Sequence, residues 1–146
     1  PYPGPSRVMI ATDMLSTRRL SITDIDLSGK RVLLRVDFNV PLDGSKVADD
    51  TRIRATLPAI EHIMQRAHSL TIISHLGRPD GKPVPKYSLR PVFEHLKKLI
   101  PYPITFLPDC CGPAFEEACM TAKSGNITLL ENVRFHPEEE SSEESP

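Results

Sequence analysis

Cationic side chains follow the apolar segments of this 146-residue chain at several points. In residues 74–81 (SHLGRPDG), His75 and Arg78 come directly after the apolar run 70–73. Arg35, Arg52 and Arg134 lie near the ends of other such segments. A guanidinium group offers a planar fork of donors that matches phosphate and carboxylate oxygens. A single His and Arg in a loop would indicate solvated surface, but this number of cations predicts a site for a small anion.

Polar side chains of other kinds accompany these cations. Asp37, Asn39, Asp109 and Glu131 also follow apolar runs. Arg35 lies inside such a run, and a charge buried in an apolar strand is costly unless it is paired. We therefore expect Arg35 either to pair, with Asp37 or Glu131, or to face a crevice.

The elements that must position these residues can be predicted from the pattern of apolar residues. Strands are expected at residues 32–36, 70–74, 104–107 and 127–130, separated by helices at about 51–67, 88–100 and 114–122. Asp50 or Thr51 is expected to cap the first helix, and Pro58 either to kink it or to begin its regular part. Ser88 is expected to cap the second helix.

Strands that alternate with helices predict an α/β fold. We expect a parallel sheet with helices on both faces, a Rossmann-like three-layer αβα arrangement with both faces of the sheet buried. The carboxyl ends of parallel strands meet at one edge, so the polar residues named above should gather there.

Other functions are disfavoured by what the sequence lacks. It contains neither a GxxxxGK[ST] nor a GxGxxG motif, so neither a Walker-type nucleotide site nor a dinucleotide-binding fold is supported. Three cysteines without CxxC spacing predict neither a disulfide framework nor a metal site, and Cys110 and Cys111 are expected to be inert, although a redox-active pair is an alternative. A net charge of −1 and the lack of a long apolar run argue against nucleic acid and membrane. His62, His68, His95 and His136 are expected at the surface, and a cytoplasmic location is expected.

Five segments together resemble the amino-terminal half of phosphoglycerate kinase. They are residues 35–41 (RVDFNVP), 51–53 (TRI), 74–79 (SHLGRP), 109–113 (DCCGP) and 129–135 (LLENVRF). The resemblance extends over about residues 14–140. It implies reversible phosphoryl transfer between 1,3-bisphosphoglycerate with ADP and 3-phosphoglycerate with ATP.

The resemblance also implies roles for individual residues. Arg52 would be the catalytic cation and Arg35 a supporting member of the basic patch. Asp37 and Asn39 would hold the glycerate end, and His75, Arg78 and Arg134 the 3-phosphate. The complete set of implied substrate-binding residues is Asp37, Phe38, Asn39, Arg52, His75, Leu76, Gly77, Arg78 and Arg134.

In the family that the chain resembles, a second domain binds ATP or ADP and Mg2+, so these sites are expected outside this chain. We expect residues 14–137 to form an incomplete amino-terminal domain with an unpaired sheet edge, residues 1–13 a disordered extension, and residues 138–146 an acidic disordered tail. The chain is expected to be monomeric and inactive alone. The alternatives are a non-catalytic phosphoglycerate-binding module and an unstable truncated product.

Overall fold

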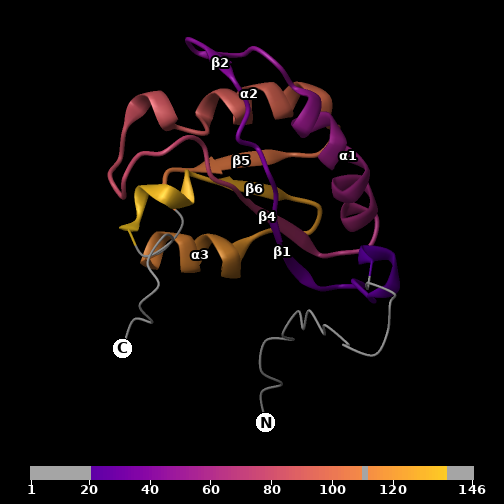
Figure 1. The fold of residues 1–146 in the computed structure, drawn as a ribbon. Helices are drawn as coiled ribbons and strands as arrows, with labels where there is room; N and C mark the ends of the chain where they lie inside the picture. The colour runs from indigo at the N-terminus through magenta and orange to yellow at the C-terminus, as the bar shows by residue number, and fades with distance from the viewer. Residues whose placement is uncertain (1–20, 110–111, 138–146) are drawn as a thin grey trace, which may run out of the picture.

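The fold is built on a sheet of four parallel strands (Figure 1). The computed structural model describes residues 21–109 and 112–137. The strands lie in the order β1 (Arg31–Arg35), β4 (Ser69–Ile73), β6 (Ile127–Leu130) and β5 (Ile104–Leu107). The predicted parallel sheet is confirmed. The strands β5 and β6 have the predicted bounds, whereas β1 and β4 each begin and end one residue earlier.

Helices cover both faces of this sheet, as predicted. They are α1 (Thr51–Met64), α2 (Arg90–Leu99) and α3 (Pro113–Thr121), and Figure 1 shows α2 on one side of the sheet and α3 on the other. The hydrophobic core lies on the side of α1 and α2, where Ile53 and Leu96 meet Ile72 and Leu129. The predicted segments 1–13 and 138–146, with Cys110 and Cys111, lie outside the described residues.

The face that carries α3 is less well covered than the sequence predicts. Leu33 of β1 is 55% exposed. Its register partner in β4 is Thr71, which in turn lies beside Thr128 of β6. The prediction that both faces of every strand are buried is therefore wrong, because α3 contributes no buried side chain. Arg35 shares this face and is exposed, so its charge is not buried in the sheet. The expectation that it pairs or faces a crevice stays a prediction.

An antiparallel hairpin after β1 was not predicted. It consists of β2 (Leu42–Asp43) and β3 (Lys46–Val47), joined at Gly44, which has a φ of 60°. Glycine at the first position of the two-residue loop, Gly44-Ser45, is a common signal for such a turn, but the two strands are too short to show a pattern. Three 3-10 turns complete the described fold: η1 (Ile22–Asp24), η2 (Pro85–Tyr87) and η3 (Val133–Phe135).

The start of α1 differs in detail from the prediction. Asp50 occupies the N-cap position, but its side chain makes no capping hydrogen bond. Asp49 makes a hydrogen bond of this kind instead. Its Oδ1 accepts from the Thr51 backbone N–H at 2.9 Å and from the Thr51 hydroxyl at 2.6 Å. The helix runs through Pro58, which therefore does not begin its regular part.

Candidate functional site

Three loops meet at the carboxyl edge of the sheet, after β1, β4 and β6. Ser74, at the end of β4, joins all three. Its Oγ accepts a hydrogen bond from the Phe38 backbone N–H at 2.9 Å, and its carbonyl accepts from the Val133 N–H at 3.1 Å. Ser74 is fully buried, so these bonds are shielded from water. Ser74 therefore connects the loops after β1, β4 and β6 by buried hydrogen bonds.

Asn39 and Gly77 extend this connection between the β1 and β4 loops. The Gly77 backbone N–H donates to Asn39 Oδ1 at 2.9 Å. Gly77 has a φ of 61°, and a Cβ atom at this position would lie 2.3 Å from the Tyr87 ring. Both the backbone conformation and the close approach of the ring require glycine here. Asn39 thus serves as a structural acceptor in this state of the site.

Arg52 reaches back from the first turn of α1 to the β1 loop. Its Nη1 donates to the Asn39 carbonyl at 2.8 Å and lies 3.3 Å from Asp37 Oδ1. The Arg52 and Asp37 side chains are 55% and 58% exposed. An exposed ion pair of this kind contributes roughly 0 to 1 kcal/mol, so an incoming anion can compete for the guanidinium group.

Arg134 approaches the same loop from η3. Its Nη1 donates to the Gly77 carbonyl at 3.2 Å. Its backbone N–H donates to Asn132 Oδ1, while Asn132 Nδ2 donates to the carbonyls of Leu76 and Tyr87 at 2.7 and 2.9 Å. Asn132 is 1% exposed and joins three segments. The sequence did not indicate its role, because nothing in the apolar pattern marks an asparagine inside a loop as buried.

The structure therefore brings most of the predicted site residues to one edge. A chain of hydrogen bonds runs from Arg52 through Asn39 and Gly77 to Arg134. Arg78 is exposed and His75 half-buried in the same β4 loop. The roles of all these residues as ligand contacts stay predictions.

Two of the predicted substrate-binding residues have their side chains in the core. Phe38 is fully buried and Leu76 is 4% exposed. Their side chains pack with the apolar residues beneath the edge. These two residues can therefore contact a ligand only through their backbone atoms.

The Glu131 carboxylate accepts three hydrogen bonds that the sequence did not indicate. Its Oε2 accepts from the Ser88 hydroxyl at 2.6 Å, and its Oε1 accepts from the backbone N–H groups of Leu89 and Asn132, both at 2.8 Å. Ser88 Oγ also accepts from the Arg90 N–H at 3.2 Å. The N-cap position of α2 is Leu89, however, so the prediction that Ser88 occupies it is wrong by one residue. Glu131 thus ties the start of α2 to the end of β6.

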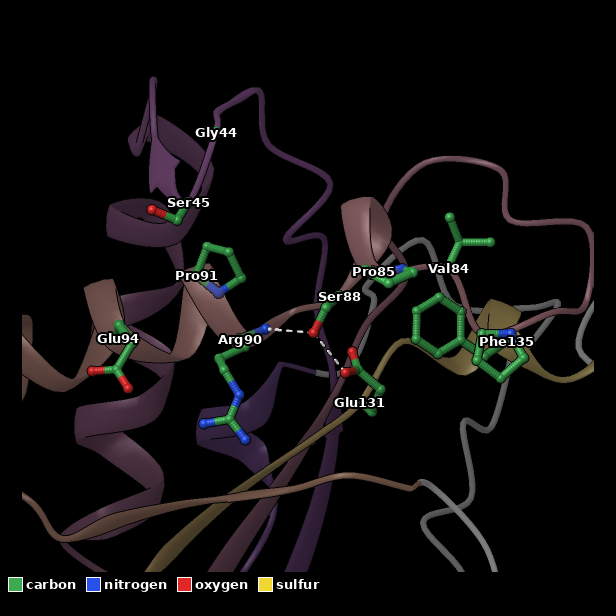
Figure 2. Close-up of a pocket in the computed structure, with 11 residues that line it drawn as sticks. Gly44, Ser45, Val84, Pro85, Ser88, Arg90, Pro91, Glu94, Glu131 and Phe135 are labelled. Atoms are coloured by element: carbon green, nitrogen blue, oxygen red, sulfur yellow. Dashed lines mark hydrogen bonds between the residues drawn. The ribbon is translucent and has the colours of Figure 1, made fainter.

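Two cavities lie close to the loops described above. One, of about 730 Å³, lies between the hairpin turn, the loop before η2 and the start of α2 (Figure 2). Its walls include Pro85, Pro91 and Phe135, and it contains none of the predicted substrate-binding residues. A smaller cavity, of about 280 Å³, is lined by the predicted site residues Asn39, Leu76 and Gly77. Neither cavity is lined by Arg52, His75, Arg78 or Arg134.

A second pair of side chains joins α1 to α2 beside the site. His95 Nε2 lies 2.9 Å from Asp50 Oδ2, and Arg54 Nε donates to the same oxygen at 2.7 Å. The hydrogen bond from His95 is the main cause that lowers the pKa of the Asp50 carboxyl. Burial opposes it, and the hydrogen bond from Arg54 lowers the pKa further. His95 was expected at the surface, but its side chain is only 30% exposed and contacts a partner.

Among residues 21–109 and 112–137, no three or more His, Cys, Asp and Glu side chains gather to hold a metal ion. Within the same ranges, no helix is long and apolar enough to cross a membrane. The donors at the cationic edge are arginine, histidine and backbone groups, which suit anions and not a divalent cation.

The fold and the edge together define a parallel α/β domain with a cation-rich strand-end site. The family model described as "Phosphoglycerate kinase" matches residues 22–145. The chain therefore belongs to the phosphoglycerate kinase family, as the resemblance of its motifs implies.

Individual relatives agree with this assignment. The phosphoglycerate kinase of Yarrowia lipolytica is 55% identical over 130 residues, which are 88% of this chain and 31% of the relative. Phosphoglycerate kinase 2 of Mus musculus is 49% identical over 129 residues. The solved structure of phosphoglycerate kinase from Pyrococcus horikoshii is 30% identical, with a TM-score of 0.72 over 86% of this chain and 30% of that one. The chain thus spans about a third of the relatives' length.

Proposed function

We propose that this chain is the phosphoglycerate-binding part of a phosphoglycerate kinase and that its cationic edge binds 3-phosphoglycerate. The observation that supports the proposal best is the chain of hydrogen bonds that links Arg52 to Arg134 through Asn39 and Gly77. It holds cations from α1 and η3 at one edge, next to the loop that carries His75 and Arg78. A three-carbon acid with a phosphate at one end presents charges at both ends to such a site.

The proposed roles follow from the chemistry of phosphoryl transfer. That reaction asks a protein mainly to position the reacting groups and to stabilise charge. His75, Arg78 and Arg134 would hold the 3-phosphate, while Asp37 and Asn39 would orient the glycerate hydroxyl. Arg52 would leave its exposed pair with Asp37 to stabilise charge on the transferring phosphoryl group, and Arg35 would add to the positive potential of this edge.

The nucleotide and Mg2+ enter this proposal as groups bound outside the described residues. When bound, they supply the phosphoryl group and neutralise part of its charge. This chain would contribute the orientation of the acceptor carboxylate and the cation at Arg52. A cytoplasmic location and a monomeric state stay predictions.

Calorimetry with 3-phosphoglycerate tests the proposal. The substitution Arg78→Ala should weaken binding by tens to hundreds of fold, because a hydrogen bond to a charged group is worth roughly 1.5 to 3 kcal/mol. The matched control is Arg66→Ala, which removes an exposed arginine just beyond the carboxyl end of α1 and should leave affinity unchanged. No binding by the wild-type chain, or equal losses in both variants, would refute the proposed site.

A non-catalytic phosphoglycerate-binding module is the second candidate, because the groups gathered at the cationic edge account for binding of an anion and not for its phosphorylation. Both candidates predict binding without turnover by this chain alone. They differ when the nucleotide-binding part of a relative is added. A kinase part should then regain phosphoryl transfer from ATP to 3-phosphoglycerate, whereas a module should not.

A further inference from the structure

The first turn of α1 uses its N-cap residue in an unusual way. Asp50 stands at the N-cap position, where an aspartate side chain normally accepts from a backbone N–H of the helix. Asp49 does this instead, through Thr51. The Asp50 carboxylate turns to α2 and meets His95 Nε2 at 2.9 Å. Because an ionised carboxylate only accepts, His95 must donate from Nε2 in this contact.

This contact is well placed to hold the first turn. The Asp50 and His95 side chains are 26% and 30% exposed, so water screens the pair less than it screens a fully exposed one. The start of α2 is itself held at the sheet edge, because Glu131 accepts from Ser88 and Leu89. The contact therefore ties the start of α1, through α2, to the carboxyl end of β6.

Arg52 depends on the position of this turn. It is the second residue of α1, and helix ends fray unless something holds them. Its guanidinium group reaches the Asn39 carbonyl at 2.8 Å only while the first turn keeps its place beside the β1 loop. If the first turn loosened, the Arg52 guanidinium group would no longer be held at the Asn39 carbonyl.

We propose that His95 is a positioning residue for Arg52, which holds the first turn of α1 through Asp50 so that the guanidinium group stays at the cationic edge. The proposal rests on the proposed function in that Arg52 is taken to meet the anionic substrate. His95 itself contacts no described member of the cationic edge. It acts through Asp50 alone.

Three variants separate positioning from general stability. The change His95→Leu removes the donor, and His95→Gln keeps an amide donor at a similar reach. The change Tyr102→Phe removes a comparable tie to the same helix, the hydrogen bond of 2.9 Å from the Tyr102 hydroxyl to Glu61 Oε2, far from Arg52. Calorimetry with 3-phosphoglycerate and thermal unfolding are measured for each.

We expect His95→Leu to weaken binding about five- to tenfold, the effect of roughly one lost hydrogen bond. The variant His95→Gln should recover to within about twofold of the wild type, and Tyr102→Phe should lower the unfolding temperature without changing affinity. In an Asp50→Asn background, His95→Leu should add little further loss. Unchanged binding in His95→Leu, no recovery with glutamine, or an equal loss in Tyr102→Phe would overturn the proposal.

A second measurement keeps this test distinct from that of the proposed function. If the wild-type chain fails to bind 3-phosphoglycerate, the proposed function fails, and the side-chain NMR signal of Arg52 Nε–H decides the positioning role. This signal should shift or broaden in His95→Leu and stay as in the wild type in His95→Gln and Tyr102→Phe. An identical signal in all four proteins would contradict the inference.

Discussion

Two residues without charge, Gly77 and Asn132, shape the site as much as its cations do. Gly77 lets the β4 loop turn back beneath Tyr87, and its two backbone polar groups bind Asn39 and Arg134. Asn132 is buried and uses its amide to hold Leu76 and Tyr87 in place. The cations can converge because these neutral groups fix the backbone that carries them.

Replacing Gly77 tests whether this glycine is needed to fix the backbone of the β4 loop. In Gly77→Ala the new methyl group would meet both an unfavourable φ and the Tyr87 ring at 2.3 Å. We expect a loss of roughly 2 to 4 kcal/mol in the free energy of unfolding, the sum of backbone strain and overpacking. Urea unfolding measures it.

Gly44→Ala is the matched control for that variant. Gly44 has nearly the same φ, 60°, but a methyl group added there would meet no atom within 4 Å. Strain alone should cost about 1 to 2 kcal/mol at this position. Equal losses in the two variants would show that the contact with Tyr87 does not constrain the loop.

At the scale of secondary structure, α1 and α2 position the site through their first turns. The start of α2 is bound by Glu131, and the start of α1 is bound to α2 by Asp50 and His95. Apolar periodicity predicted both helices but not these ties. Periodicity reports which face of a helix is buried, whereas a contact between the start of α1 and the middle of α2 depends on how the two helices lie against each other.

The pH dependence of stability should report the tie at Asp50. The hydrogen bond from His95, and then that from Arg54, lowers the pKa of this carboxyl below 3.8 in the folded chain. A lowered folded-state pKa stabilises the fold above the unfolded pKa, and that contribution is lost as the pH falls through the folded pKa. The wild type should therefore lose more stability than Asp50→Asn between about pH 5 and pH 2.

Urea midpoints measured for both proteins across this range check the expectation. Asp26, another carboxyl with a lowered pKa, titrates in both proteins and cancels in the difference. The charge of Asp50 raises the pKa of Asp49, so the difference also includes this effect on Asp49. Parallel curves for the two proteins would show that Asp50 gains nothing from its partners in the folded state.

At the scale of the whole molecule, the two faces of the sheet are unequal. One face packs α1 and α2 over a continuous core, and the other carries α3 and leaves Leu33 of the edge strand β1 55% exposed. Within the described residues β1 pairs only with β4. An edge strand with exposed apolar side chains is prone to associate with other strands.

Two substitutions in neighbouring strands, one on each face of the sheet, test whether the two faces differ in burial. Leu33→Thr should change the free energy of unfolding by less than about 0.5 kcal/mol, as surface substitutions usually do. It should also reduce self-association in light scattering. Ile72→Thr, at a fully buried position of β4, should cost roughly 2 to 4 kcal/mol, because it leaves a hydroxyl in the core and removes apolar contacts. A large loss in Leu33→Thr would show that the open face is covered in solution.

The sequence by itself determined that strands and helices alternate and that the sheet is parallel. The motifs in residues 35–41, 74–79 and 129–135 determined the family. Local patterns suffice for these, because apolar periodicity and motif spacing are properties of short segments. Only the tertiary structure decided that Asn39 and Gly77 link Arg52 to Arg134. It also decided which side chains are buried: those of Phe38 and Leu76 face the core, whereas that of Arg35 is exposed. The hydrogen bond between His95 and Asp50 is likewise visible only in the folded chain. The physical reason is that each of these depends on which groups meet across the fold, and a hydrogen bond between residues far apart in the chain leaves no periodic trace in the sequence.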